Sequence, residues 1–152
     1  MNDTSLFAAD AENNIINVFD IVSGNPVSTI GKHSQLASPI DVAITRNNEL
    51  FALEGQGSGR VRVFRATSGE PLPNFILPSY VRMLDVSPDD NFMYVNGPYA
   101  SGRIEVRNAL DGALLEAITL DENSEDKIIK DICVSPDGNF VFVANNVKII
   151  QY

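Results

Sequence analysis

The stretch that decides the fold is "CVSPDGNFVFVANN", residues 133–146, in which apolar residues lie on both sides of a turn. Nearly the same phrase occurs earlier as "DVSPDDNFMYVNG" at 85–97, and more loosely as "DVAITRNNELFALEG" at 41–55. Repetition at a spacing of a few tens of residues is the sequence signature of repeat architectures. We therefore expect a chain built from repeated structural units.

Aligned on the apolar run that follows the turn, residues 1–152 divide into four units of a single domain. A complete unit has an apolar run, a polar Gly/Asn loop, an alternating run such as "RVRVFR", a glycine turn and two more short apolar runs. This pattern predicts four short strands joined by hairpin turns, with no helix. The units are residues 6–49, 50–91, 92–139 and the incomplete 140–152.

The strands that open the units carry apolar residues on both faces. They read "LFAL", "FMYV" and "FVFV", although the hairpin turns imply antiparallel pairing. An antiparallel sheet with one solvated face would alternate apolar and polar residues instead. Each sheet is therefore expected to lie between two others. Four-stranded units of roughly 45 residues that stack radially are the blades of a β-propeller.

The phrases "VSPDGNFVFVANN", "VSPDDNFMYVNG" and "INVFDIVSGNPVSTI" resemble the YVTN and lactonase-like propeller repeats, which are related to WD40 repeats. The resemblance covers essentially the whole chain. The Gly-His and Trp-Asp pairs of WD40 repeats are missing, since the chain has no tryptophan and one histidine. The expected fold class is all-β, with about three and a half four-stranded antiparallel blades that form an open wedge or half of a closed ring.

An open wedge exposes two apolar blade faces. Each buried Val, Leu, Ile or Phe contributes roughly 1.5–3 kcal/mol, so such faces usually mark an interface. Three arrangements stay open at this point: a piece of a longer propeller, a half that pairs with itself as a homodimer, or a chain that binds a different protein partner. For self-association, two copies have the strand number of seven four-stranded blades, but the connectivity at each junction fits a closed two-fold ring of eight blades better.

Composition limits the classes of partner. The net charge is −9, from 20 acidic and 11 basic residues. Repulsion by like charge predicts no binding to nucleic acid or to an anionic membrane. No apolar run is long enough to span a bilayer, and no basic segment with an apolar core suggests a signal peptide. The compartment is not identified, and the cytoplasm is the default expectation.

The resemblance implies that two sets of loops share one mouth of the central channel, where ligands usually bind. The polar connections at that mouth give four predicted contact residues: Tyr80, Tyr99, Arg60 and Arg103. The alternative for these is a solvent-facing hairpin tip. Asp41 and Asp131 begin equivalent innermost strands and are predicted to face the channel. They could bind a cation or cap a neighbouring loop.

Other polar features are interpreted structurally. "GQGSGR", residues 55–60, precedes a predicted strand rather than a helix, so it is a hairpin loop and not a phosphate loop. "DENSED", residues 121–126, lacks the calcium-loop spacing and is expected to be a solvated acidic loop. His33 is expected to be a loop histidine, and Cys133 a small buried residue of an innermost strand. No metal and no cofactor are predicted.

The function predicted from these features is a non-catalytic binding or scaffold module that engages a protein or a small ligand. Two alternatives rest on the resemblance alone. One is part of a lactonase-like or quinoprotein-like enzyme that acts on a small metabolite. The other is a structural repeat of a cell-surface YVTN protein. No acid/base pair or cofactor motif in these residues matches an enzyme position by position, and enzymatic activity is therefore not assigned.

Overall fold

The computed structural model describes residues 5–32, 35–55, 57–120, 127–145 and 149–151. In these ranges fourteen strands form four antiparallel sheets, which we number as blades 1 to 4 in chain order. Blade 1 contains β1 (Ser5–Asp10), β2 (Ile15–Asp20) and β3 (Pro26–Ile30). Blade 2 contains β4 (Pro39–Ile44), β5 (Glu49–Glu54), β6 (Arg60–Arg65) and β7 (Pro71–Ile76). Blade 3 contains β8 (Leu84–Val86), β9 (Phe92–Asn96), β10 (Arg103–Asn108) and β11 (Leu114–Thr119). Blade 4 contains β12 (Ile129–Val134), β13 (Val141–Asn145) and β14 (Ile149–Gln151).

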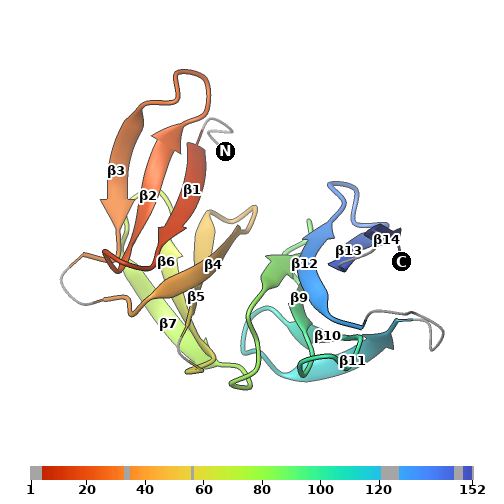
Figure 1. Ribbon diagram of the computed structural model, residues 1–152. Coiled ribbons are helices and arrows are strands. Elements are labelled where there is room, and N and C mark those ends of the chain that lie inside the picture. The colour runs from red at the N-terminus through yellow and green to blue at the C-terminus, as the bar shows by residue number, and fades with distance from the viewer. Residues whose placement is uncertain (1–4, 33–34, 56, 121–126, 146–148, 152) are drawn as a thin grey trace.

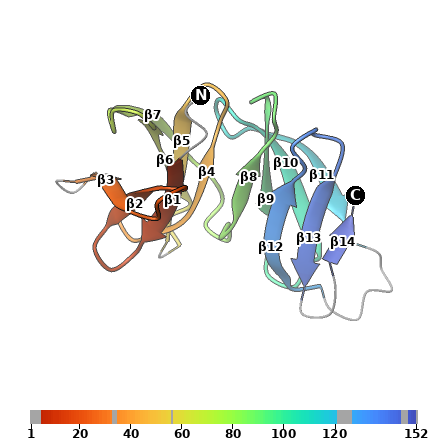
Figure 2. The same cartoon turned by 90° about the horizontal axis from the view of Figure 1, so that it is seen from above.

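The four blades stack face to face along an arc that does not close into a ring (Figure 1). Within each blade the strands follow one another in chain order, joined by hairpins. The first strands of blades 2, 3 and 4 lie side by side at the inner edge of the arc, where β8 contacts both β4 and β12 (Figure 2). The predicted fold class, all-β propeller blades in an open arrangement, is confirmed.

Three apolar clusters fill the three junctions between successive blades. The apolar sequence of β5 is explained by the position of this strand between two of these clusters. Leu50 and Ala52 belong to the cluster between blades 1 and 2, whereas Phe51 and Leu53 belong to the cluster between blades 2 and 3. All four side chains are buried. The strand is therefore covered on both faces, as the absence of alternation predicts.

The repeated Ser-Pro-Asp phrase is a side-chain-closed turn. The Ser87 hydroxyl donates to Asp89 Oδ1 and accepts from the backbone N–H of Phe92 at 2.9 Å. Ser135 makes the same two bonds, to Asp137 at 2.6 Å and from the N–H of Phe140 at 2.9 Å. Serine and aspartate recur because their oxygens satisfy groups that the hairpin leaves unpaired.

The turns of blades 3 and 4 are one residue longer than that of blade 2. Ile44 pairs with Leu50, but Val86 pairs with Met93 and Val134 with Val141. The structural counterparts of Leu50 are therefore Met93 and Val141, one residue beyond the positions that the sequence phrases align. A one-residue shift exchanges the two faces of a strand, so this register decides which side chains meet between blades.

Neighbouring turns are also joined to each other. Asp90, in the turn of blade 3, accepts the backbone N–H groups of Arg46 and Asn47 in the turn of blade 2, at 2.8 and 3.1 Å. Asp90 adopts a left-handed backbone conformation with φ of 61°. Aspartate tolerates that conformation better than most residues, and here its carboxylate caps a turn in the adjacent blade.

Two glycines of the β5–β6 loop allow a matched test of how closely this loop approaches the backbone at Leu77. Both have positive φ, +62° at Gly59 and +74° at Gly57. A Cβ at Gly59 would lie 2.1 Å from the carbonyl oxygen of Leu77, whereas a Cβ at Gly57 has nothing within 4 Å. We expect Gly59→Ala to lower the free energy of unfolding by at least about 3 kcal/mol, and Gly57→Ala by about 1 kcal/mol from backbone strain alone. Urea unfolding of the two variants measures the difference, and equal losses would contradict the close approach.

Candidate functional site

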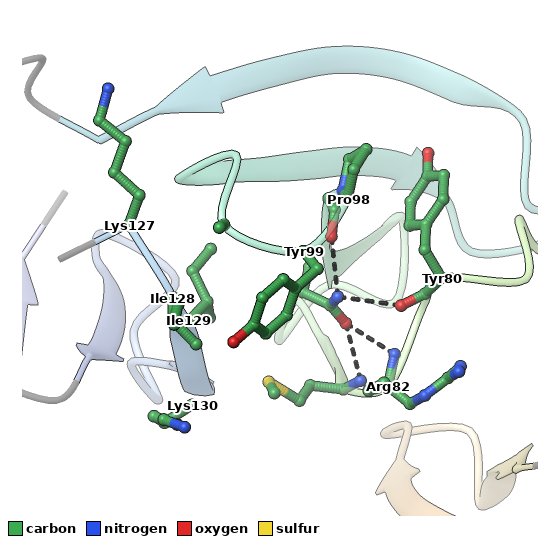
Figure 3. A pocket seen from close by; sticks show the side chains of 12 residues that line it. Tyr80, Arg82, Pro98, Tyr99, Lys127, Ile128, Ile129 and Lys130 are labelled. Atoms are coloured by element: carbon green, nitrogen blue, oxygen red, sulfur yellow. Dashed lines mark hydrogen bonds between the residues drawn. The ribbon is translucent and has the colours of Figure 1, made fainter.

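A cleft of about 370 Å³ opens between blades 3 and 4 at one end of the arc. Three segments line it: the approach to β8 with Tyr80, Arg82 and Met83, the β9–β10 loop from Asn96 to Ala100, and residues 127–130 leading into β12 (Figure 3). The volume lies within the range of small-molecule sites, about 300–1,000 Å³. The cleft is the candidate functional site.

Asn96 fixes the floor of this cleft. Its side chain is buried, and Oδ1 accepts the backbone N–H groups of Arg82 at 2.7 Å and Met83 at 3.0 Å. Nδ2 donates to the carbonyl oxygens of Tyr80 at 3.2 Å and Gly97 at 2.9 Å (Figure 3). One side chain thus joins the β8 approach to the β9–β10 loop, with both ends of its amide satisfied.

Tyr99 stands on the loop that Asn96 anchors. Its side chain is 81% exposed, and Figure 3 shows the ring directed toward residues 127–130. The loop turns tightly behind the ring, since the N–H of Ser101 donates to the carbonyl of Pro98 at 3.0 Å and Ala100 has a φ of 54°. The ring therefore presents a planar apolar surface from a well-defined loop.

The charged residues that line the cleft in the described ranges are Arg82, Lys127 and Lys130, and these ranges contribute no carboxylate to the lining. Figure 3 shows Arg82 and Lys127 at opposite ends of the cleft. Arg82 Nη1 donates to the carbonyl oxygens of Ser79 and Val81, both at 2.8 Å, which fixes the guanidinium. The rim is therefore positive in a chain whose net charge is −9.

The Tyr80 hydroxyl turns away from the cleft into the junction between blades 2 and 3. It donates to Oε1 of the buried Glu105 at 2.7 Å, and Glu105 Oε2 accepts from Arg107 Nε at 2.9 Å. Burial and the hydrogen bond to Glu105 raise the pKa of Tyr80. The hydroxyl of Tyr80 is therefore committed to this network.

The structure does not place Arg60 and Arg103 in the cleft. They begin β6 and β10, and each pairs with a buried glutamate, Arg60 with Glu54 at 3.5 Å and Arg103 with Glu105 at 3.6 Å. Of the four predicted loop residues, the structure therefore brings only Tyr80 and Tyr99 together. Contact of any of the four with a ligand stays a prediction.

Sequence reasoning missed three cleft residues: Asn96, Arg82 and Lys130. Asn96 had one available signal, since a polar residue that ends an otherwise apolar strand is often buried with hydrogen-bond partners. Arg82 and Lys130 come just before the apolar core of β8 and β12. Nothing in their local pattern distinguishes them from other surface cations.

Asp41 joins two innermost strands. Its Oδ1 accepts the N–H of Val42 in its own strand at 2.9 Å, and its Oδ2 accepts the N–H of Leu84 in blade 3 at 2.8 Å. Asp85 repeats the arrangement, with Val86 at 2.8 Å and Val134 of blade 4 at 2.7 Å. These carboxylates join neighbouring blades and act as staples between them, and cation binding or loop capping by Asp41 stays a prediction.

Asp131 makes only the first half of this arrangement in the described part of the chain. Its Oδ1 accepts the N–H of Ile132 at 3.0 Å, and the side chain is exposed. Cys133, two residues on, is exposed as well, so the prediction that it is buried was wrong. It lies on the face of β12 that no further blade covers. Partial burial and the carboxylates of Asp85 and Asp131 raise the pKa of its thiol.

Two predicted features, His33 and the acidic segment 121–126, lie outside the described residues. The loop that begins at Gly55 continues into β6, as its context predicted. In the described ranges no three His, Cys, Asp or Glu side chains are grouped so that they could hold a metal ion. Nor does that part of the chain contain a helix long and apolar enough to cross a membrane.

Comparison with known proteins supports the fold and does not add a family. No family model matches the chain, and no curated protein matches it. Solved structures do match, among them hydrazine synthase of Kuenenia stuttgartiensis, a β-propeller-containing protein, with a TM-score of 0.69 and 14% sequence identity. The match covers 97% of this chain and 42% of that chain.

These results define a β-propeller-like protein. Because 1187 solved chains match, the architecture is too common to specify an activity.

The partly buried carboxylates of Asp41 and Asp85 make stability depend on pH. Burial raises the pKa of Asp41 from 3.8 to about 6, although the N–H groups of Leu84 and Val42 oppose the shift, and burial also raises the pKa of Asp85. The folded protein therefore holds protons that the unfolded chain releases between about pH 4 and 6. We expect stability to rise as the pH falls from 7 to 4.5, with Asp41 contributing on the order of 1–3 kcal/mol.

Below about pH 3.8 the stability decreases as the pH falls further, because hydrogen bonds lower the pKa of the turn carboxylates Asp89 and Asp137. Thermal unfolding followed by circular dichroism from pH 3 to 8 measures both limbs. Asp41→Asn should flatten the limb between pH 7 and 4.5, whereas Asp111→Asn, in an exposed turn, should leave it unchanged. A stability that rises monotonically from pH 4.5 to 7 would contradict this assignment.

The role of Asn96 is tested by its removal. Asn96→Ala leaves the N–H groups of Arg82 and Met83 and two carbonyls without their partner, and we expect a loss of about 2–4 kcal/mol in the free energy of unfolding. Asn74→Ala, on the exposed side of β7, should change stability by less than about 0.5 kcal/mol. Urea unfolding compares the two variants, and a small effect at Asn96 would show that the loop is held by other contacts.

Proposed function

We propose that this chain is a non-catalytic binding module of the YVTN or lactonase-like propeller type. Its ligand is a small molecule that carries a planar apolar group and an acidic group, and its site is the cleft between blades 3 and 4. The observation that carries the proposal is an exposed aromatic ring, Tyr99, on a loop that the buried Asn96 fixes to the cleft floor.

The apolar part of the ligand is inferred from the walls. The ring of Tyr99 faces the segment that contains Ile128 and Ile129, and Met83 and Pro98 also line the cleft. A planar group that enters between the ring and this segment gains contact on two sides. Aromatic pairs in offset or edge-to-face geometry contribute about 0.5–1.5 kcal/mol beyond the area they bury.

The acidic part is inferred from the rim. Arg82, Lys127 and Lys130 supply positive charge, and no carboxylate lines the cleft from the part of the chain that the structure describes. Within the described part of the chain only Nη1 of Arg82 is engaged. The remaining guanidinium nitrogens can donate to a carboxylate or phosphate, which is the recognition that arginine geometry favours.

Benzoate and its neutral analogue benzamide test this proposal as probes. In a titration followed by ¹⁵N–¹H correlation spectra, we expect benzoate to shift the amide signals of residues 97–100 and 127–130, and benzamide to shift them less. Tyr99→Ala should weaken benzoate about three- to tenfold, which corresponds to the loss of one aromatic contact. Lys130→Glu should remove the preference for benzoate over benzamide.

Leu110→Ala is the matched control, since Leu110 is exposed on a turn outside the cleft. It should leave both titrations unchanged. Shifts spread over the whole surface, or Tyr99→Ala binding benzoate as well as the unmodified protein does, would overturn the proposed site.

A further inference from the structure

The two outer faces of the arc have no blade packed on them in this structure. We call the outer face of blade 1 the first flank, with Leu6, Ala8 and Phe19, and the outer face of blade 4 the last flank, with Cys133, Phe142 and Ala144. Leu6 is 52% exposed, and Phe19, Phe142 and Ala144 are only partly buried. The internal junctions of the same molecule show what covers faces of this kind.

The first flank repeats the residues by which blade 2 packs on blade 1. In blade 1, Leu6 pairs with Phe19 and Ala8 follows on the same face, and in blade 2 Leu50 pairs with Phe64 and Ala52 follows. The same three residue types thus occupy the same three positions. In blade 2 all three are buried in one cluster with residues of blade 1: Ile16, Val18 and Ile30.

The last flank repeats the surface that receives such a face. In the corresponding strands β1, β5 and β9, an aromatic residue is directed toward the following blade: Phe7, Phe51 and Tyr94. Each of these three packs in the cluster at its junction. Phe142 pairs with Cys133 at the corresponding position of blade 4, and no blade covers it in this structure.

We propose that the occupant of both flanks is a second copy of this chain. The last flank of each copy packs on the first flank of the other, in the same sense as the three internal junctions, and the two junctions close a ring with two-fold symmetry. The association buries apolar side chains that would otherwise remain in contact with water. This association is independent of the ligand proposed for the cleft.

The hydrogen bonding of Asp131 distinguishes a second copy of this chain from a different partner protein. At the internal junctions, Asp41 and Asp85 accept an N–H from the innermost strand of the following blade. Blade 1 has no counterpart of β4 among its described strands, because β1 corresponds to β5. The described residues of the first flank therefore offer Asp131 no such N–H. A partner chain that contributes a complete blade would offer one.

The test uses two charge substitutions, Leu6→Asp on the first flank and Phe142→Asp on the last. Light scattering after size-exclusion chromatography should give twice 16.6 kDa for the unmodified protein and 16.6 kDa for each variant alone. An equimolar mixture of the two variants should regain dimers, because one junction then joins two intact flanks. Its dissociation constant should be at least tenfold above that of the unmodified protein, since the other junction is lost.

Controls separate the junction from folding. Val22→Asp, at an 83% exposed turn position, and Asp131→Asn should both remain dimeric. Circular dichroism should show the same far-ultraviolet spectrum and a cooperative thermal transition for the folded variants, and Ala8→Arg and Ala144→Arg replace the two aspartate variants if either of these does not fold. A monomer at 0.1 mM unmodified protein, dimers of both single variants, or a mixture that stays monomeric would overturn the proposal. Dissociation by Asp131→Asn would overturn it as well, because the junction would then depend on a contact that the described first flank does not offer.

Discussion

The constraint on which this structure depends is that each sheet must be covered on both faces. Strands such as β5 carry apolar side chains on both sides, so a single blade cannot shield its own surface. Stacking blades face to face satisfies this need, and the three junction clusters are the result. The turn motifs, the interblade carboxylates and the cleft all occur where this stacking brings two blades together.

The fold could be predicted because its signals are local and repeated. The apolar runs and the Ser-Pro-Asp turns identify the strands and hairpins without long-range information. The register was harder, because a turn longer by one residue in blades 3 and 4 exchanges the faces of the strand that follows. Cys133 is an example of a prediction that was wrong. Its place in an innermost strand suggests burial, but the exposure of its side chain depends on whether a further blade covers that face.

The candidate site was predicted only in part, for a similar reason. Tyr80 and Tyr99 could be placed near one mouth from the order of the loops, but the role of Asn96 requires knowledge of which two segments it joins. Arg60 and Arg103 look free in the sequence, and their partners Glu54 and Glu105 lie on the strands themselves. Ion pairing of this kind depends on which faces of neighbouring strands align, and loop composition does not reveal it.

The aspartate staples also affect how opening motions would be observed. The amides of Leu84 and Val134 donate to carboxylates of the preceding blade, so their hydrogen bonds cross a junction and do not belong to a sheet ladder. Hydrogen exchange at these two amides therefore reports separation of one blade from the next. Exchange at ladder amides within β5 or β9 reports melting of a sheet. The chain thus contains internal probes that distinguish a hinge between blades from the unfolding of a blade.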